Sequence, residues 1–284
     1  MYAITGVTGK VGGAVARTLL RQNQGVRAIV RDAGKAQDWV NAGCEIAVAD
    51  FADAAALITA FAGTKGVFIV LPPVFDPTGG FPEARAMIAN IKSALITARP
   101  PKAVVISTIG ADATQTNLLS QLGILEAELS GLDLPVTFLR PAWFMENAAW
   151  DVADAKDGVI RSYLQPLGKA FPMVATEDVG QTAAALLLET GSGVRIVELE
   201  GPVRVSPDDL AAAFSAVLGH GVRAEIVERA GWEDLFRGQG MVNPLPRMQM
   251  LDGFNAGWID FPQARSRHGT TTLAEVVQAL VANG

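Results

Sequence analysis

The chain has 284 residues, and because 50% of them are hydrophobic and only 18% are charged, it can bury a large core in one domain with a smaller companion. Its net charge of −6, without a dense cluster of Lys or Arg, argues against nucleic acid as a direct partner. A single cysteine excludes an internal disulfide, and two histidines far apart leave no ordinary zinc site, so we expect no metal.

The first residues predict a turn that binds phosphate. Residues 2–5 are typical of a short buried strand, and Gly6, Gly9 and Gly12 follow it at three-residue spacing, where apolar residues at helical spacing begin. Gly6 permits a tight turn, Gly9 lets a pyrophosphate approach the backbone, and Gly12 lets the helix lie close to the sheet. A helix N-terminus attracts anions, so this segment predicts a dinucleotide site. The alternative is a glycine-rich turn without a ligand.

The position of this first strand also bears on location. A strand that begins at residue 2 leaves no room for a signal peptide ahead of it. No apolar run reaches about 18 residues, so we expect no membrane-spanning segment. A cytoplasmic protein is the expectation that follows.

The second predicted strand, residues 26–30, ends at the position that meets the adenosine ribose in dinucleotide-binding folds. An acidic residue at this position selects NAD, whereas an arginine pairs with the 2′-phosphate of NADP. Arg31 comes first and Lys35 follows within reach, so the sequence favours NADP over NAD. Asp32 could still hold a ribose hydroxyl, and Arg31 could alternatively be a solvated surface charge.

The third predicted strand, residues 45–49, ends at Asp50 and Phe51. This strand end lies beside the adenine in such folds, where Asp50 could accept a hydrogen bond from the exocyclic amine and Phe51 could pack on the ring. The alternative is that Asp53 caps the next helix and Phe51 lies in the core.

Strands and helices then alternate along the chain. The sequence predicts helices over 54–61, 83–98, 118–130 and 176–189, and strands over 66–71, 102–107, 135–139 and 194–199. This alternation predicts an α/β fold with a Rossmann-like, doubly wound parallel sheet. We expect residues 1–150 to form an NAD(P)-binding domain to which 176–200 return. Residues 151–175 and 201–284 would form a small C-terminal substrate lobe.

Large apolar side chains crowd into one stretch of the expected lobe, with Gly and Pro between them. Adaptable side chains on irregular backbone suit the wall of a pocket for a flat aromatic ligand. The alternative is the core of the lobe or a contact between the two copies of a homodimer. The predicted pocket residues are Trp143, Phe144, Trp232, Phe236, Met241, Met248 and Phe254.

Four segments together resemble one family: residues 5–12, 30–32, 140–147 (Arg-Pro-Ala-Trp-Phe-Met-Glu-Asn) and 270–275. They are similar to the NmrA-like branch of the atypical short-chain dehydrogenases, and most similar to its quinone and triphenylmethane reductase group. The resemblance implies a cofactor domain with a small substrate lobe. It also implies the cofactor contacts: Gly6, Thr8, Gly9, Lys10 and Val11 at the pyrophosphate, Arg31 at the 2′-phosphate, Leu71 and Pro72 along the cofactor, and Pro141, Trp143 and Phe144 near the nicotinamide with Asn147 behind them.

The sequence departs from the wider superfamily, which uses Tyr-x-x-x-Lys to move a proton. Only Tyr2 and Tyr163 are present, and the helix that often carries a Lys in relatives has Ala127 there. A quinone, a dye or another electron-poor conjugated acceptor has less need of a proton relay than a ketone. Thr108 and Asn147 are the polar candidates for steering such an acceptor, unless either is a satisfied structural group.

These observations favour an NADPH-dependent reductase of an electron-poor aromatic or conjugated small molecule. The alternative is a non-catalytic regulator of the NmrA type, which binds NAD(P) and reports redox state to a protein partner. A sugar-nucleotide epimerase or dehydratase is a weaker alternative. Its chemistry must deprotonate a hydroxyl, and the Tyr/Lys pair that would do so is absent from the sequence.

Overall fold

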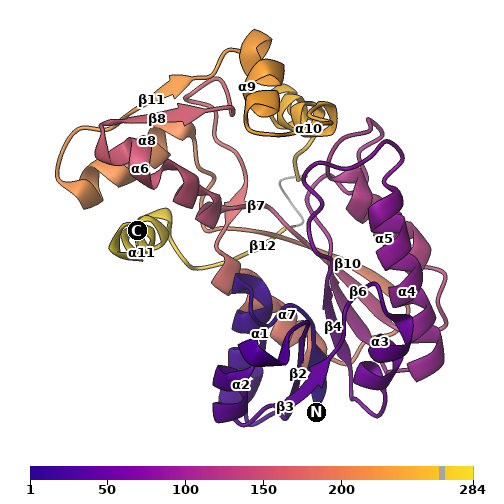
Figure 1. Ribbon diagram of the computed structural model, residues 1–284. Helices are drawn as coiled ribbons and strands as arrows, with labels where there is room; N and C mark the ends of the chain where they lie inside the picture. The colour runs from indigo at the N-terminus through magenta and orange to yellow at the C-terminus, as the bar shows by residue number, and fades with distance from the viewer. Residues whose placement is uncertain (262–265, 284) are drawn as a thin grey trace.

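A parallel sheet of eight strands forms the centre of the molecule, in the order β12-β10-β6-β5-β4-β1-β2-β3 (Figure 1). The computed structural model describes residues 1–261 and 266–283. The strands of this sheet are β1 (Tyr2–Ile4), β2 (Val26–Val30), β3 (Glu45–Val48), β4 (Val67–Val70), β5 (Ala103–Ile106), β6 (Val136–Pro141), β10 (Val194–Glu200) and β12 (Arg267–His268). The strand order reverses between β1 and β4, where ligands bind in such sheets.

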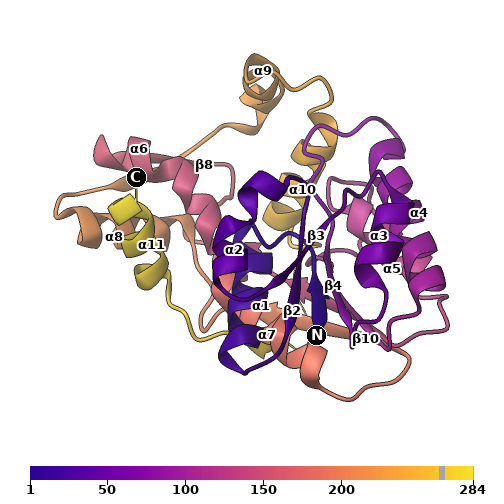
Figure 2. The same cartoon turned by 60° about the horizontal axis from the view of Figure 1, so that its bottom comes forward.

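Helices cover both faces of the sheet, so the predicted doubly wound α/β fold is confirmed (Figures 1 and 2). Successive strand residues point to opposite faces: Ile4 and Phe68 pack on one side, and Ala3 and Ile69 on the other. The first face carries α1 (Lys10–Arg21), α2 (Gln37–Asn41) and α7 (Thr176–Leu188), and the second carries α3 (Ala54–Phe61), α4 (Pro82–Ala98) and α5 (Ser120–Leu129).

A smaller group of elements lies beside the sheet, at the upper left of Figure 1. Its two parallel strands are β8 (Val159–Ser162) and β11 (Arg223–Ile226). A separate hydrophobic cluster, which includes the fully buried Phe214, holds them against helices. Those helices are α6 (Val152–Lys156), α8 (Pro207–Leu218) and α11 (Leu273–Asn283). We call this group the small lobe.

The segment between the small lobe and the sheet contains α9 (Trp232–Gly238) and α10 (Leu245–Ala256), preceded by η3 (Arg229–Gly231). Its large side chains belong to the hydrophobic cluster of the α1 face of the sheet rather than to the lobe cluster. The remaining short elements are η1 (Ala33–Lys35), η2 (Met145–Asp151) and the parallel pair β7 (Trp143–Phe144) and β9 (Met173–Val174).

Local sequence signals explain several boundaries. The strand 26–30 and the helix 54–61 have the predicted bounds. Ser206 and Asp209 form a reciprocal capping box at the start of α8. One assignment needs correction, because residues 267–268 fall in the predicted lobe but form β12 at the edge of the main sheet. Residues 262–265 and 284 of the predicted lobe lie outside the described residues.

Within 1–261 and 266–283, no helix is both long and apolar enough to cross a bilayer. The same residues contain no group of three or more His, Cys, Asp or Glu side chains placed to hold a metal ion.

Candidate functional site

Gly6 and Gly12, in the turn between β1 and α1, are packed too closely to carry side chains. Gly6 has a φ of +64°, and a Cβ there would lie 2.5 Å from Val70 Cγ1. A Cβ on Gly12 would lie 2.3 Å from the Gly6 carbonyl oxygen, so α1 begins against the turn itself. Gly9 is the N-cap of α1 and supplies no side-chain cap, and the first turn contains no acidic residue. The helix N-terminus is therefore free to bind a phosphate, with Thr8 and Lys10 exposed beside it.

Cations without partners lie at the end of the neighbouring strand. Arg31 and Lys35 are exposed and, like Lys10, form no ion pair with any residue in the described part of the chain. The Asp32 carboxylate instead accepts a hydrogen bond of 2.8 Å from the Gly34 amide, and so caps η1. This arrangement fits a 2′-phosphate better than a bare ribose hydroxyl, because the basic groups are free and the acid is engaged.

After β3, Asp53 and Phe51 have the roles of the alternative interpretation, in which Asp53 caps the next helix and Phe51 lies in the core. Asp53 caps α3 by accepting a 3.0 Å hydrogen bond from the Ala56 amide, and Phe51 is buried in the core. Asp50 is exposed and accepts a hydrogen bond from the Ala52 amide. Contact of Asp50 and Phe51 with an adenine stays a prediction.

The two predicted steering residues lie just beyond the carboxyl ends of β5 and β6. Thr108 follows β5 and is half-buried, and Asn147 is half-buried in η2, which follows β6 and β7. Neither side chain forms a hydrogen bond with another residue of the described segments. Leu71 and Pro72 follow β4, and Pro141 is the last residue of β6, so these strand ends face the same edge of the sheet.

A buried ion pair lies directly beneath this edge. Arg140 of β6 forms a bidentate pair with Glu126 of α5, with N···O distances of 2.8 and 2.6 Å. The third guanidinium nitrogen, Nη1, lies 2.8 Å from Asp112, and the Ser107 hydroxyl donates to Glu126. Hydrogen bonding to Glu126 raises the pKa of Arg140 against the opposing effect of burial. The Arg140 charge is thus neutralised by the protein, and the network fixes the ends of β5 and β6.

The glutamate of the same motif has a different partner. Glu146 accepts hydrogen bonds from the Thr176 amide at 2.8 Å and from its hydroxyl at 2.5 Å. It therefore caps the N-terminus of α7 from outside the helix, where a carboxylate is favourable. Sequence reasoning missed this role, although the Thr-Glu-Asp start of α7 lacks a cap of its own.

The predicted aromatic pocket is largely interior. Trp232 and Phe236 are 0% exposed and Phe254 is 2% exposed, which corresponds to the alternative of a core. A residue without exposed surface cannot form a pocket wall in this conformation, so this part of the pocket prediction is corrected. Met248 is also buried. The wall role stays a prediction for the half-buried residues Trp143, Phe144 and Met241.

Some predicted pocket residues do meet. The Trp143 and Phe254 rings contact each other edge to face, with centroids 5.3 Å apart. Tyr163, which the sequence did not indicate, stacks on Phe236 at 5.1 Å and meets the edge of Trp232 at 5.7 Å. The segment after β6 therefore contacts α10 through Trp143 and Phe254, and the rings of Tyr163, Trp232 and Phe236 form a second aromatic cluster.

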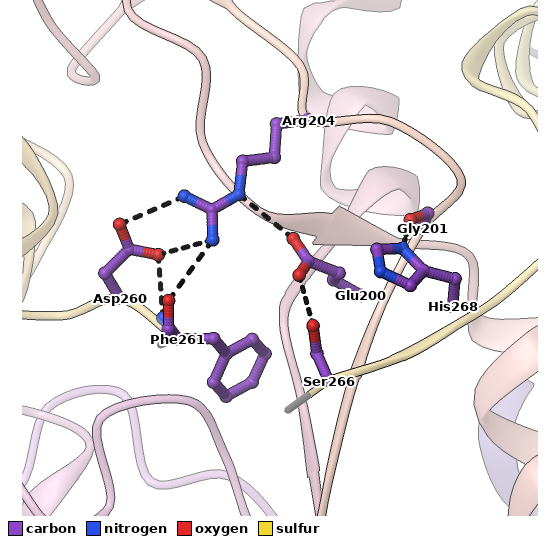
Figure 3. A network of polar contacts seen from close by, with 7 residues as sticks. All are labelled: Glu200, Gly201, Arg204, Asp260, Phe261, Ser266 and His268. Atoms are coloured by element: carbon purple, nitrogen blue, oxygen red, sulfur yellow. Dashed lines mark hydrogen bonds and ion pairs between the residues drawn. The ribbon is translucent and has the colours of Figure 1, made fainter. Parts of the chain in front are cut away.

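A polar network holds the end of β10 to the chain on both sides of residues 262–265 (Figure 3). The buried Glu200 pairs with Arg204 at 3.1 Å and accepts a hydrogen bond from the Ser266 hydroxyl. Arg204 also pairs with Asp260 at 2.9 Å. This network anchors the α9–α10 segment to the sheet and brings β12 alongside β10.

The chain matches the NmrA-like family over residues 2–256. It belongs to that family. Among similar proteins, NAD(P)H azoreductase from Xenophilus azovorans is 28% identical over 86% of this chain and 83% of its own length. Quinone oxidoreductase 2 from Escherichia coli (strain K12) is 28% identical over 99% of this chain and 98% of its own. The solved structure of NADPH-dependent quinone oxidoreductase QOR2 from Escherichia coli, complexed with NADPH, has a TM-score of 0.82 at 26% identity and covers 99% of both chains.

Proposed function

We propose that this NmrA-like protein is a reductase that uses NADPH to reduce an electron-poor aromatic or conjugated small molecule, such as a quinone or a dye, without a Tyr-x-x-x-Lys proton relay. It is an NAD(P)H-dependent oxidoreductase. One observation carries the proposal about the acceptor. At the carboxyl ends of β5 and β6, the charged side chains of Arg140 and Glu146 already form hydrogen bonds within the protein. The neutral side chains of Thr108 and Asn147 form no hydrogen bond within the described structure.

The residues present fit NADPH. The uncapped start of α1 would hold the pyrophosphate through backbone N–H groups, and Arg31 with Lys35 would hold the 2′-phosphate. The nicotinamide supplies a hydride when the cofactor is bound. Pro141, Trp143 and Phe144 would lie beside that ring.

The protein's part in the reaction is then orientation. Thr108 can donate its hydroxyl proton and Asn147 its amide protons to an oxygen or nitrogen of the acceptor, without losing an existing bond within the described structure. Both groups are neutral, so they can hold and polarise an acceptor whose charge is delocalised as it is reduced. The names of two relatives, an azoreductase and a quinone oxidoreductase, agree with acceptors of this kind.

The test is consumption of NADPH by the purified protein with a quinone, an azo dye and a triphenylmethane dye. We expect turnover with at least one of them, and a loss of kcat of roughly 10-fold or more in Asn147→Ala and Thr108→Ala with unchanged NADPH affinity. NADPH binding without turnover across the panel would instead favour the regulator. Unchanged kcat in both variants would contradict the roles of the two side chains.

A further inference from the structure

Arg247 occupies an unusual environment on α10. Its guanidinium lies over the Phe236 ring, 4.5 Å from the centroid, and Nη1 lies 3.8 Å from the sulfur of Met241. The residue is half-buried. Burial lowers the pKa of Arg247, and the nearby Tyr163 opposes this shift. The guanidinium nonetheless remains charged at any ordinary pH.

The positive charge of Arg247 has no protein counter-ion in the described part of the chain, since its hydrogen-bonded contact is the Met241 sulfur. A second arginine of the same region provides a contrast. Arg229 lies over Trp232 at 4.9 Å, but it also forms a bidentate pair with Asp252 at 2.7 and 2.8 Å. Removing a guanidinium from water is costly unless an anion or good acceptors compensate. At Arg247 the ring and the sulfur are weak substitutes for such an anion.

The position of Arg247 relates it to the candidate site. Phe254 lies seven residues further along α10, which places it on the same helix face about 10 Å away. The Phe254 ring in turn contacts Trp143, in the segment expected beside the nicotinamide. The Leu118 amide donates to the Pro246 carbonyl at 2.9 Å, so the start of α10 is also fixed to the chain beyond β5. Arg247 thus lies about two helical turns from Phe254, the residue of α10 that contacts the segment expected beside the nicotinamide.

We propose that Arg247 binds an anionic substituent of the acceptor, so that the substrate class is an aromatic or conjugated molecule carrying a sulfonate, carboxylate or phosphate. This inference rests on the proposed function. A guanidinium gives two parallel hydrogen bonds to any of these groups, and the flat rings of Trp143 and Tyr163 suit the aromatic part of such a molecule. The anion compensates the half-buried charge that the described part of the chain leaves unpaired.

The kinetic test compares a naphthoquinone with the same naphthoquinone carrying a sulfonate. We expect Arg247→Met to lower kcat/KM for the sulfonate by roughly 10- to 100-fold more than for the neutral quinone. Each acceptor is compared with itself in the wild-type enzyme, so their different reduction potentials cancel. Arg229→Met is the matched control and should leave the ratio of the two acceptors unchanged. The NADPH affinity of Arg247→Met should also be unchanged, since a loss would assign the arginine to a cofactor phosphate and overturn the proposal.

A binding measurement separates this proposal from the proposed function. Naphthalene sulfonate and the neutral naphthalene sulfonamide cannot be reduced by NADPH, and titration calorimetry gives their affinities. We expect the wild type to prefer the sulfonate and Arg247→Met to lose that preference. This result without turnover of any acceptor would keep the anion site and refute the reductase. The anion site would be refuted if the wild type showed no preference for the sulfonate, or if Arg247→Met kept the same preference. Turnover of neutral quinones together with either result would still support the reductase.

Discussion

Individual residues of segment 140–147 (Arg-Pro-Ala-Trp-Phe-Met-Glu-Asn) have different structural roles. Arg140 is paired with Glu126 and fixes the ends of two strands, and Glu146 caps α7. Asn147 follows directly after this capping residue and has no hydrogen bond of its own side chain within the described chain. Its position is therefore set by its neighbour while its amide stays free for a ligand.

Arg31 is the residue that should determine the choice of cofactor. We expect Arg31→Ala to weaken NADPH binding by roughly 10- to 100-fold, because it removes charge-assisted hydrogen bonds to the 2′-phosphate. NADH lacks that phosphate, so its affinity should change little. Titration calorimetry with both nucleotides gives the comparison, and Arg21→Ala, a helix-surface change on α1, serves as the control. An equal loss for NADPH and NADH would exclude this role.

Asp151 should make stability depend on pH near neutrality. Burial, together with the nearby charge of Asp154, raises the pKa of Asp151 from 3.8 to about 7. The folded protein therefore keeps a proton that the unfolded chain releases near pH 4, and stability falls as the pH rises from about 4 to 7. We expect Asp151→Asn to raise the free energy of unfolding by roughly 1 to 3 kcal/mol at about pH 8 and to change it little at about pH 4. Urea unfolding at both pH values tests this, and an equal effect at both would contradict it.

At the scale of elements, loops at the carboxyl edge of the sheet are tied to the α9–α10 segment. The Asp76 carboxylate, in the loop after β4, accepts hydrogen bonds from the amides of Val242 at 2.8 Å and Asn243 at 2.6 Å. The Gln121 amide of α5 donates to the Val74 carbonyl at 3.0 Å and fixes the same loop. One carboxylate from the first half of the chain thus binds two successive amides of the connection between α9 and α10.

Removing that carboxylate should loosen the connection. We expect Asp76→Ala to speed amide hydrogen exchange of Val242 and Asn243 by roughly 10- to 100-fold, because each amide loses a charge-assisted bond. Exchange in β4 should stay unchanged, as its ladder bonds are intact. Glu83→Ala removes a carboxylate from the start of α4 without touching these amides and is the control. Unchanged exchange over 241–246 would show that packing alone holds the connection.

Local sequence patterns predicted most of these elements, because apolar spacing and caps act within a few residues. Strand 26–30 and helix 54–61 were predicted in this way. The pairings of Arg140 with Glu126 and of Asp76 with Val242 were not, since they depend on how distant segments meet. A strand of two residues, such as β12, is too short to show periodicity.

The same reasoning explains what was predicted of the site. Its glycine turn lies in one continuous segment, so the glycines between a strand and a helix predicted the close packing at Gly6 and Gly12. Composition identified the aromatic residues, but it does not show which of them are buried by the rest of the chain. Trp232 and Phe236 were therefore wrongly predicted to line the wall of a substrate pocket. Arg247 stands in an apolar stretch, and that local signal could have identified it.

At the scale of the whole molecule, the small lobe has a hydrophobic cluster of its own, whereas the glycine turn proposed to bind NADPH packs on the sheet. We expect Phe214→Ala to destabilise the lobe by roughly 3 to 5 kcal/mol, because it leaves a cavity at a fully buried position. NADPH affinity should be retained. Hydrogen exchange of β8 and β11, with calorimetric NADPH titration, measures both effects. Phe68→Ala, in the sheet beside β1, should instead weaken NADPH binding, and loss of NADPH binding in Phe214→Ala would contradict the separation.

The path of the chain has a consequence for engineering this protein. After β6 it enters the lobe, it returns to the sheet for α7 and β10, leaves again for α8 and β11, returns for β12, and ends in the lobe helix α11. The lobe is therefore not a cassette that can be grafted from a relative, because each transplanted piece would bring mismatched neighbours in the sheet. A changed range of acceptors is better sought by replacing side chains in place, on α10 and in the segment after β6.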